Sequence, residues 1–175
     1  KQSLAGLVNV GYNFRRTDRI GVSAFFARNA SDSYMLRQGR DDEKRILTTS
    51  NQTSHVYMLQ NYQLAGNHTF GKWDVNWSGS YSTTSSDEPD RRQVMFRKID
   101  GVWKLFRLNQ QQTSRYFGAL DENEGVADLR AQYNFNDRDK LRFGFAFRDK
   151  SRDFTCTRFY YNLDGLGDLE MTDFY

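Results

Sequence analysis

The chain has 175 residues and lacks several features by which common protein classes are recognised. It contains 1 proline and 1 cysteine, which excludes collagen-like repeats, a disulfide framework and a cysteine-rich zinc site. No apolar run reaches the length of about 18 residues that a transmembrane helix needs. No long block of one charge sign exists, and 25 Lys+Arg stand against 22 Asp+Glu, so we do not expect nucleic acid as a partner.

Aromatic residues are plentiful instead, with 14 Phe, 10 Tyr and 3 Trp, and they alternate with polar residues. Alternation with a period of two is typical of β-strands that have one apolar and one polar face. The pattern predicts three antiparallel hairpins joined by short turns. Their strands centre on residues 8–14 and 20–26, 56–70 and 75–81, and 127–135 and 141–147.

The segments between these hairpins are long and polar. We predict two long loops there, at about residues 36–54 and 85–124. The second loop contains a smaller hairpin of its own, residues 94–98 and 102–108, because Asp100-Gly101 is a strong signal for a tight turn.

Short turns at one end and long loops at the other are typical of bacterial outer-membrane β-barrels. In lipid, a closed sheet satisfies the backbone, apolar side chains face outward and polar ones face a wet lumen. About six long strands are too few to close alone, since the smallest such barrels need about eight. We therefore predict an all-β, antiparallel, partial transmembrane β-barrel, with residues 1–175 as a single unit. A soluble antiparallel sheet with its apolar face on a core is the alternative.

Four stretches carry a resemblance to a known family: Asn9-Val10-Gly11-Tyr12-Asn13-Phe14 with its turn into Ile20-Gly21-Val22-Ser23, Leu59-Gln60-Asn61-Tyr62-Gln63-Leu64, Ser85-Ser86-Asp87-Glu88-Pro89-Asp90-Arg91-Arg92, and Asp149-Lys150-Ser151-Arg152-Asp153-Phe154. With them the chain resembles a mid-barrel segment of TonB-dependent outer-membrane receptors, of the kind abundant in Bacteroides-like bacteria.

The resemblance implies a parent with a plug domain inside a barrel of about 22 strands. Such a parent lies in the outer membrane of a Gram-negative bacterium and takes up a scarce nutrient, such as an iron-siderophore, cobalamin or glycan ligand. Its partners would be the lipid bilayer, the small ligand and the TonB system, the last through the plug. The sequence contains neither a plug-like domain nor a TonB-box-like segment, and we expect an excised piece of barrel wall that self-associates when isolated.

Aromatic and basic residues in the two predicted loops are the candidates for ligand contact, because ring faces beside guanidinium groups suit aromatic or anionic ligands. The alternative is that the rings pack the loops together, and that Arg91 and Arg92 form an ion-pair network with Asp87, Glu88 and Asp90. The candidates are Tyr34, Arg91, Arg92, Phe96, Trp103, Arg107 and Tyr116.

Nothing in the sequence indicates catalysis. His55 and His68 are the 2 histidines, neither stands in a metal-ligand motif, and we find no nucleophile elbow or phosphate loop. We expect no enzyme activity, no cofactor and no metal site. The acidic runs 41–43 and 121–124 lack the spacing of a calcium loop, so solvated loops are favoured over calcium binding.

Two functions from different classes are compatible with the sequence. The first is a fragment of a TonB-dependent transporter that contributes barrel wall and extracellular loops. The second is a soluble or surface-displayed all-β ligand-binding module without catalysis. The apolar faces of the hairpins discriminate between them, because they would face lipid in the first and converge on a core in the second.

Overall fold

The computed structural model describes residues 1–107, 113–162, 165 and 169–171. Within them the chain forms one antiparallel sheet of seven strands and contains no α-helix. This confirms the prediction of an all-β fold with six long strands. The strands are β1 (Gln2–Asn13), β2 (Arg19–Arg40), β3 (Ile46–Phe70), β4 (Trp73–Ile99), β5 (Val102–Leu105), β6 (Ser114–Asn134) and β7 (Lys140–Tyr160).

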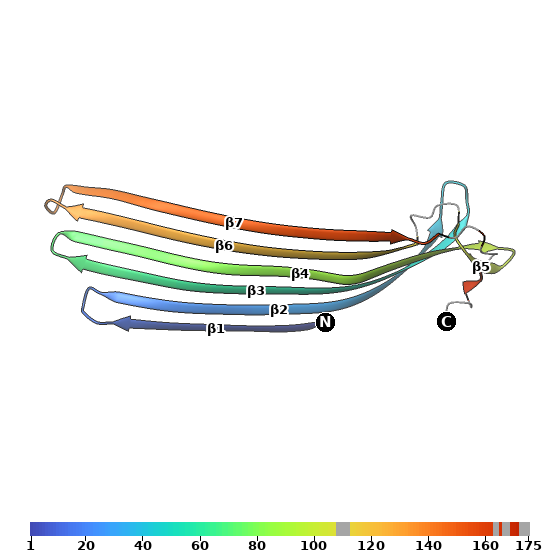
Figure 1. The fold of residues 1–175 in the computed structure, drawn as a ribbon, viewed down its shortest axis with the longest axis horizontal. Coiled ribbons are helices and arrows are strands. Elements are labelled where there is room, and N and C mark those ends of the chain that lie inside the picture. The colour runs from blue at the N-terminus through green and yellow to red at the C-terminus, as the bar shows by residue number, and fades with distance from the viewer. Residues whose placement is uncertain (108–112, 163–164, 166–168, 172–175) are drawn as a thin grey trace.

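The strands lie in the order β1-β2-β3-β4-β6-β7, and the short β5 pairs only with β4. The three short turns gather at one end of the sheet and β5 lies at the other end (Figure 1). The sheet is open, and β1 and β7 are its two edges. The structure is therefore a strip of sheet and not a closed barrel.

All three predicted hairpins form, and the register fixes which residues share a face. Val10 lies opposite Val22 in the first hairpin, Leu64 opposite Gly79 in the second, and Leu129 opposite Phe145 in the third. Directly opposite residues in an antiparallel pair project to the same side, so each hairpin has one apolar face.

The prediction of long loops at 36–54 and 85–124 is wrong. Strand β2 runs to Arg40 and β3 begins at Ile46, which leaves a turn of residues 41–45, while β4, β5 and β6 occupy most of the second segment. Apolar and polar residues do not alternate regularly in these stretches, although the backbone ladder continues. Sequence periodicity detects a continuous apolar face and not strand pairing as such.

The small hairpin within the second segment is confirmed. Ile99 pairs with Val102 across Asp100-Gly101, which have φ angles of 50° and 85°. Both residues thus adopt the left-handed conformation that a tight Asp-Gly turn requires. The second strand of this hairpin ends at Leu105, and the predicted end at Leu108 lies outside the described residues.

Very little of the described chain is buried. The one small core lies at the β5 end, where Phe96 and Leu105 pack with Val94, Trp103, Leu169 and Met171. In the described part of the chain, the long strands contact their sheet neighbours and no second layer covers them. Apolar side chains in the hairpins are therefore exposed; Phe145 and Val8 are each 63% exposed.

Candidate functional site

The apolar faces of the three hairpins join into one continuous surface, which we call the apolar band. It crosses all six long strands on one side of the sheet near the short turns, and the strand register places its members side by side. Its main members are Val8, Val10, Tyr12, Ile20, Val22, Ala24, Phe26, Tyr62, Leu64, Phe70, Trp73, Val75, Trp77, Tyr81, Leu129, Ala131, Tyr133, Leu141, Phe143, Phe145 and Phe147.

The height of the apolar band is close to that of a bilayer core. On β4 it runs from Trp73 to Tyr81, which is about 26 Å at roughly 3.3 Å per residue. Outer-membrane barrels show an outward apolar band about 25 Å tall. The apolar band occupies only the part of each strand nearest the short turns.

Aromatic rings lie at both borders of the apolar band. Trp73 and Tyr133 lie 4.9 Å apart between ring centroids at the border near the short turns. At the opposite border, Tyr62 lies directly across from Tyr81. Rings at both borders are typical of proteins that meet the two interfaces of a membrane.

An imidazole side chain lies within the apolar band. His68 lies on this face, opposite Val75, and its ring stacks against Trp77 at 6.3 Å. Its Nδ1 atom lies 3.2 Å from the Oδ1 atom of Asp18, a buried carboxylate in the first short turn. The imidazole is therefore tied to the turn end of the sheet.

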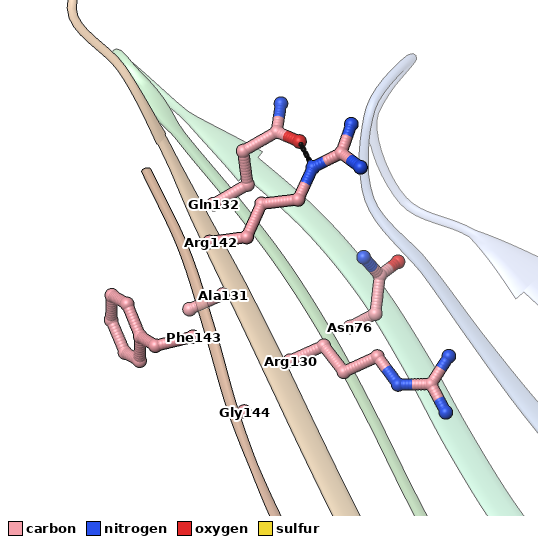
Figure 2. Close-up of a pocket in the computed structure, with 7 residues that line it drawn as sticks. All are labelled: Asn76, Arg130, Ala131, Gln132, Arg142, Phe143 and Gly144. Atoms are coloured by element: carbon pink, nitrogen blue, oxygen red, sulfur yellow. Dashed lines mark hydrogen bonds between the residues drawn. The ribbon is translucent and has the colours of Figure 1, made fainter. Parts of the chain in front are cut away.

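The reverse side of the same strands, which we call the polar face, carries charged, amide and hydroxyl side chains. Figure 2 shows Asn76, Arg130, Gln132 and Arg142 extending to one side of β6 and β7 while Phe143 extends to the other. Arg142 Nε donates to Gln132 Oε1, and Arg130 Nε lies 3.0 Å from Asp128 Oδ1. These residues border an open depression of about 520 Å³.

Further from the short turns, acids of β6 meet bases of β7 on the polar face. Glu122 lies 2.7 Å from Lys150 Nζ and also pairs with Arg152, and Glu124 lies 2.7 Å from Arg148 Nη2. Hydrogen bonds from Lys150 and Arg152 hold the pKa of Glu122 below its ordinary value. This carboxylate is therefore ionised at neutral pH.

A β-bulge lies in β4 beyond these pairs. Glu88 is opposite Gly118 and Arg91 is opposite Tyr116, so β4 holds one extra residue between the two pairs. The single proline, Pro89, lies in this bulge, where a residue without an N–H leaves no ladder position unpaired. The proline in the predicted loop thus marks an irregularity within a strand.

The bulge brings a set of charged residues together. Asp90 accepts hydrogen bonds from Arg115 at 2.8 and 2.9 Å and from Arg92 at 2.5 Å. The Arg115 guanidinium in particular holds the pKa of Asp90 below its ordinary value. The guanidinium of Arg92 is thus paired with Asp90, as the ion-pair alternative to ligand contact predicts.

A second group lies on the polar face at the same level. Arg91 donates two hydrogen bonds to Glu88, at 2.5 and 2.8 Å, and His55 Nε2 lies 3.1 Å from the same carboxylate. The Arg91 and Arg158 guanidinium carbons lie 4.8 and 5.4 Å from the centre of the Tyr116 ring. Of the candidate contacts, Arg91, Arg92 and Tyr116 are thus brought to the bulge.

The other candidates have other neighbours. Phe96 is 3% exposed, so packing of the small core, and not ligand contact, is the role its position allows. Trp103 packs against that core and its ring lies 5.7 Å from Lys98 Nζ. Tyr34 is exposed on β2 opposite Gln52, and Arg107 lies just after β5.

The two acidic runs lie in different elements, residues 41–43 in a turn and residues 121–124 in β6. Residues 121–124 lie within β6, so their side chains alternate between the two faces. Asp41 and Glu43 both pair with Arg45 in the turn between β2 and β3. No group of three potential metal ligands occurs among the described residues.

An aromatic hollow lies near the end of β7, and the sequence singles out Arg115 and Phe117 as contact candidates without predicting that they join residues of β7. Arg115, Phe117, Phe159 and Tyr161 line a space of about 370 Å³ together with Tyr160 and Asn162. The Phe117 and Phe159 rings meet edge to face at 5.8 Å. Alternation of residues 155–161 signals a continued strand, but only the register with β6 brings Phe159 beside Phe117.

Comparison with known proteins places the chain in no family. No protein-family model matches the chain, and its sequence matches no curated protein. No helix in the described ranges is long and apolar enough to cross a membrane.

Proposed function

We propose that the chain is a wall segment of an outer-membrane β-barrel transporter, of the TonB-dependent type that takes up a scarce nutrient. The apolar band carries this proposal, because it is continuous over six strands, of bilayer height and bordered by aromatic rings. On this proposal the apolar band faces lipid and the polar face lines the lumen.

The energetics of burial support a lipid partner. Moving a phenylalanine side chain from water into an apolar environment is favourable by about 1.5–3 kcal/mol of free energy. The four β7 members of the apolar band, Leu141 and Phe143 among them, are all more than half exposed. Hydrocarbon removes these side chains from water without a second layer of protein. The polar face keeps its charges hydrated only if it borders an aqueous space.

The long polar ends of the strands support the transporter type. β2, β3, β4, β6 and β7 continue well past the apolar band, and their far ends carry the charged residues at the bulge and the aromatic hollow. On this proposal the far ends form the mouth, outside the bilayer, where they would meet a ligand arriving from the exterior. We assign to this segment a wall and mouth role without catalysis, while the TonB system would act through a plug elsewhere in the parent.

The test places one charge at the same depth on the two faces. Phe145→Arg puts a guanidinium in the apolar band, which costs about 2–4 kcal/mol near the middle of a bilayer. Ala146→Arg adds the same group on the polar face, since Ala146 lies opposite Asp128. We expect the first variant to disappear from the outer-membrane fraction and the second to assemble normally.

An antibody against residues 85–124 follows the native polypeptide in fractionated cells. A membrane-fraction band several-fold larger than 20.6 kDa is expected for the wild-type protein. A soluble band near 20.6 kDa, with both arginine variants unaffected in location, would instead establish the soluble binding module.

A further inference from the structure

The outer edge of β7 is a long row of unpaired backbone groups. On one side β7 pairs with β6 over all of its 21 residues, while its other side has no strand beside it in the described structure. Every residue of β7 is exposed. An exposed edge of this length is a template for another strand.

The side chains of β7 on the polar face are strongly basic. Six bases project there and no acid does, whereas the two aspartates Asp149 and Asp153 lie on the other side with the apolar band. We call this set the basic stripe; it consists of Lys140, Arg142, Arg148, Lys150, Arg152 and Arg158.

β6 neutralises only part of the basic stripe. Glu122 and Glu124 together pair with Arg148, Lys150 and Arg152. Within the described residues, Arg142 and Arg158 form no ion pair: Arg142 donates to a glutamine and Arg158 lies against Tyr116. Positive charge therefore remains for a neighbour on the free side of β7.

A second copy of this chain does not supply that neighbour. β1, its other free edge, contains no aspartate or glutamate. Pairing β7 with the β7 of a second copy would set one basic stripe beside another on the same face, and like charges directly opposite are destabilising. The charge pattern thus disfavours both self-pairings.

We propose that the free edge of β7 pairs with an antiparallel strand that carries carboxylates at alternate positions on the polar face. Opposite Leu141–Phe147 the same strand is apolar on the band face, so that the apolar band continues across it. Backbone hydrogen bonds give this pairing its geometry, and cross-strand ion pairs with the basic stripe select the partner. The proposal rests on the edge and its charges and does not require the transporter function.

β6 provides a template for the probe, because residues 116–126 already pair with Arg148–Arg158. The probe is a labelled peptide of residues 116–126 with Tyr116→Glu, which places a carboxylate opposite Arg158. The matched control peptide has glutamine at positions 116, 122 and 124. Binding to the full chain in detergent micelles is measured by fluorescence anisotropy at low and high salt.

We expect the acidic peptide to bind about tenfold more tightly than the glutamine peptide at low salt, with the difference shrinking at high salt. Arg158→Gln should weaken binding of the acidic peptide several-fold. Arg16→Gln removes one positive charge in the first turn, far from β7, and should leave binding unchanged.

Hydrogen exchange locates the peptide. Addition at the edge should protect those alternate amides of β7 that do not pair with β6, while amides of β6 keep their protection. Equal binding of the two peptides, or binding without new protection in β7, would overturn the proposal. Either outcome leaves the result for Phe145→Arg unaffected, so the two proposals fail separately.

Discussion

At the scale of single residues, the apolar band depends on close fits between neighbouring strands. Gly66 of β3 lies opposite Trp77 of β4, and the indole ring covers the glycine backbone. A Cβ atom at Gly66 would lie 2.5 Å from the indole Cε2 and Nε1 atoms. A large ring beside a glycine in a sheet shields the backbone that the glycine exposes.

Gly66→Ala is therefore expected to displace the Trp77 ring and to destabilise the sheet by about 1–3 kcal/mol. Gly79→Ala is the matched control, because its Cβ would meet nothing closer than a carbonyl oxygen at 4.0 Å. Denaturant unfolding in detergent, followed by tryptophan emission, measures both variants. Equal stability of the two variants would contradict this, because it would show that the Trp77 ring can move aside without loss of folding stability.

At the scale of elements, the bulge in β4 joins two parts of the sheet with different chemistry. On the turn side of the bulge the sheet has one apolar and one polar face, and beyond the bulge β4 leads into the small core of Phe96 and Leu105. Asp90 lies between Arg92 of its own strand and Arg115 of β6. This carboxylate therefore couples β4 to β6 where the regular ladder is interrupted.

The pH dependence of this coupling follows from the lowered pKa of Asp90, for which hydrogen bonding to Arg115 is the main cause. Because this pKa is lowered, ionised Asp90 stabilises the folded sheet fully above the ordinary carboxyl pKa of 3.8. That stabilisation is lost as the pH falls through the lowered pKa of Asp90. We expect amides of residues 88–93 and 114–117 to lose exchange protection below about pH 4.

Asp90→Asn should remove this pH dependence and weaken the bulge at neutral pH by no more than about 1 kcal/mol, since the guanidinium partners are partly exposed. Asp87→Asn is the control, because Asp87 precedes the bulge and lies opposite Ala119. If both variants kept the wild-type acid transition, Asp90 would not be the group responsible.

The elements also show how far the fold follows from the sequence alone. Hairpins such as Leu129–Phe135 with Leu141–Phe147 were predictable, because every second residue on one face is apolar. Strand ends such as Ile46–Asn51 were not, since apolar and polar residues do not alternate there and backbone pairing alone leaves no periodic signal. For the same reason, Arg91 and Tyr116 were identifiable as residue types, while their contact required the register across the bulge.

At the scale of the whole molecule, the open sheet combines an uncovered apolar band with two unpaired edges. Only four apolar residues of the described chain are buried, and three of them, Phe96, Leu105 and Phe106, lie at the β5 end. Isolated sheets without a covering layer are marginal in water. The hairpins therefore need lipid, detergent or another protein surface over the apolar band.

We accordingly expect the isolated chain to form oligomers in water and to become monomeric in detergent, because association is the remaining way to bury the apolar band. Phe145→Ser removes one ring from the apolar band and should shift the oligomers toward smaller species. Phe154→Ser removes a ring of similar exposure that lies on the polar face, opposite Leu120, and should have little effect. Sedimentation velocity with and without detergent measures both variants. A monodisperse monomer of the wild-type chain in water would contradict this expectation, because it would show that the apolar band stays exposed to water without driving association.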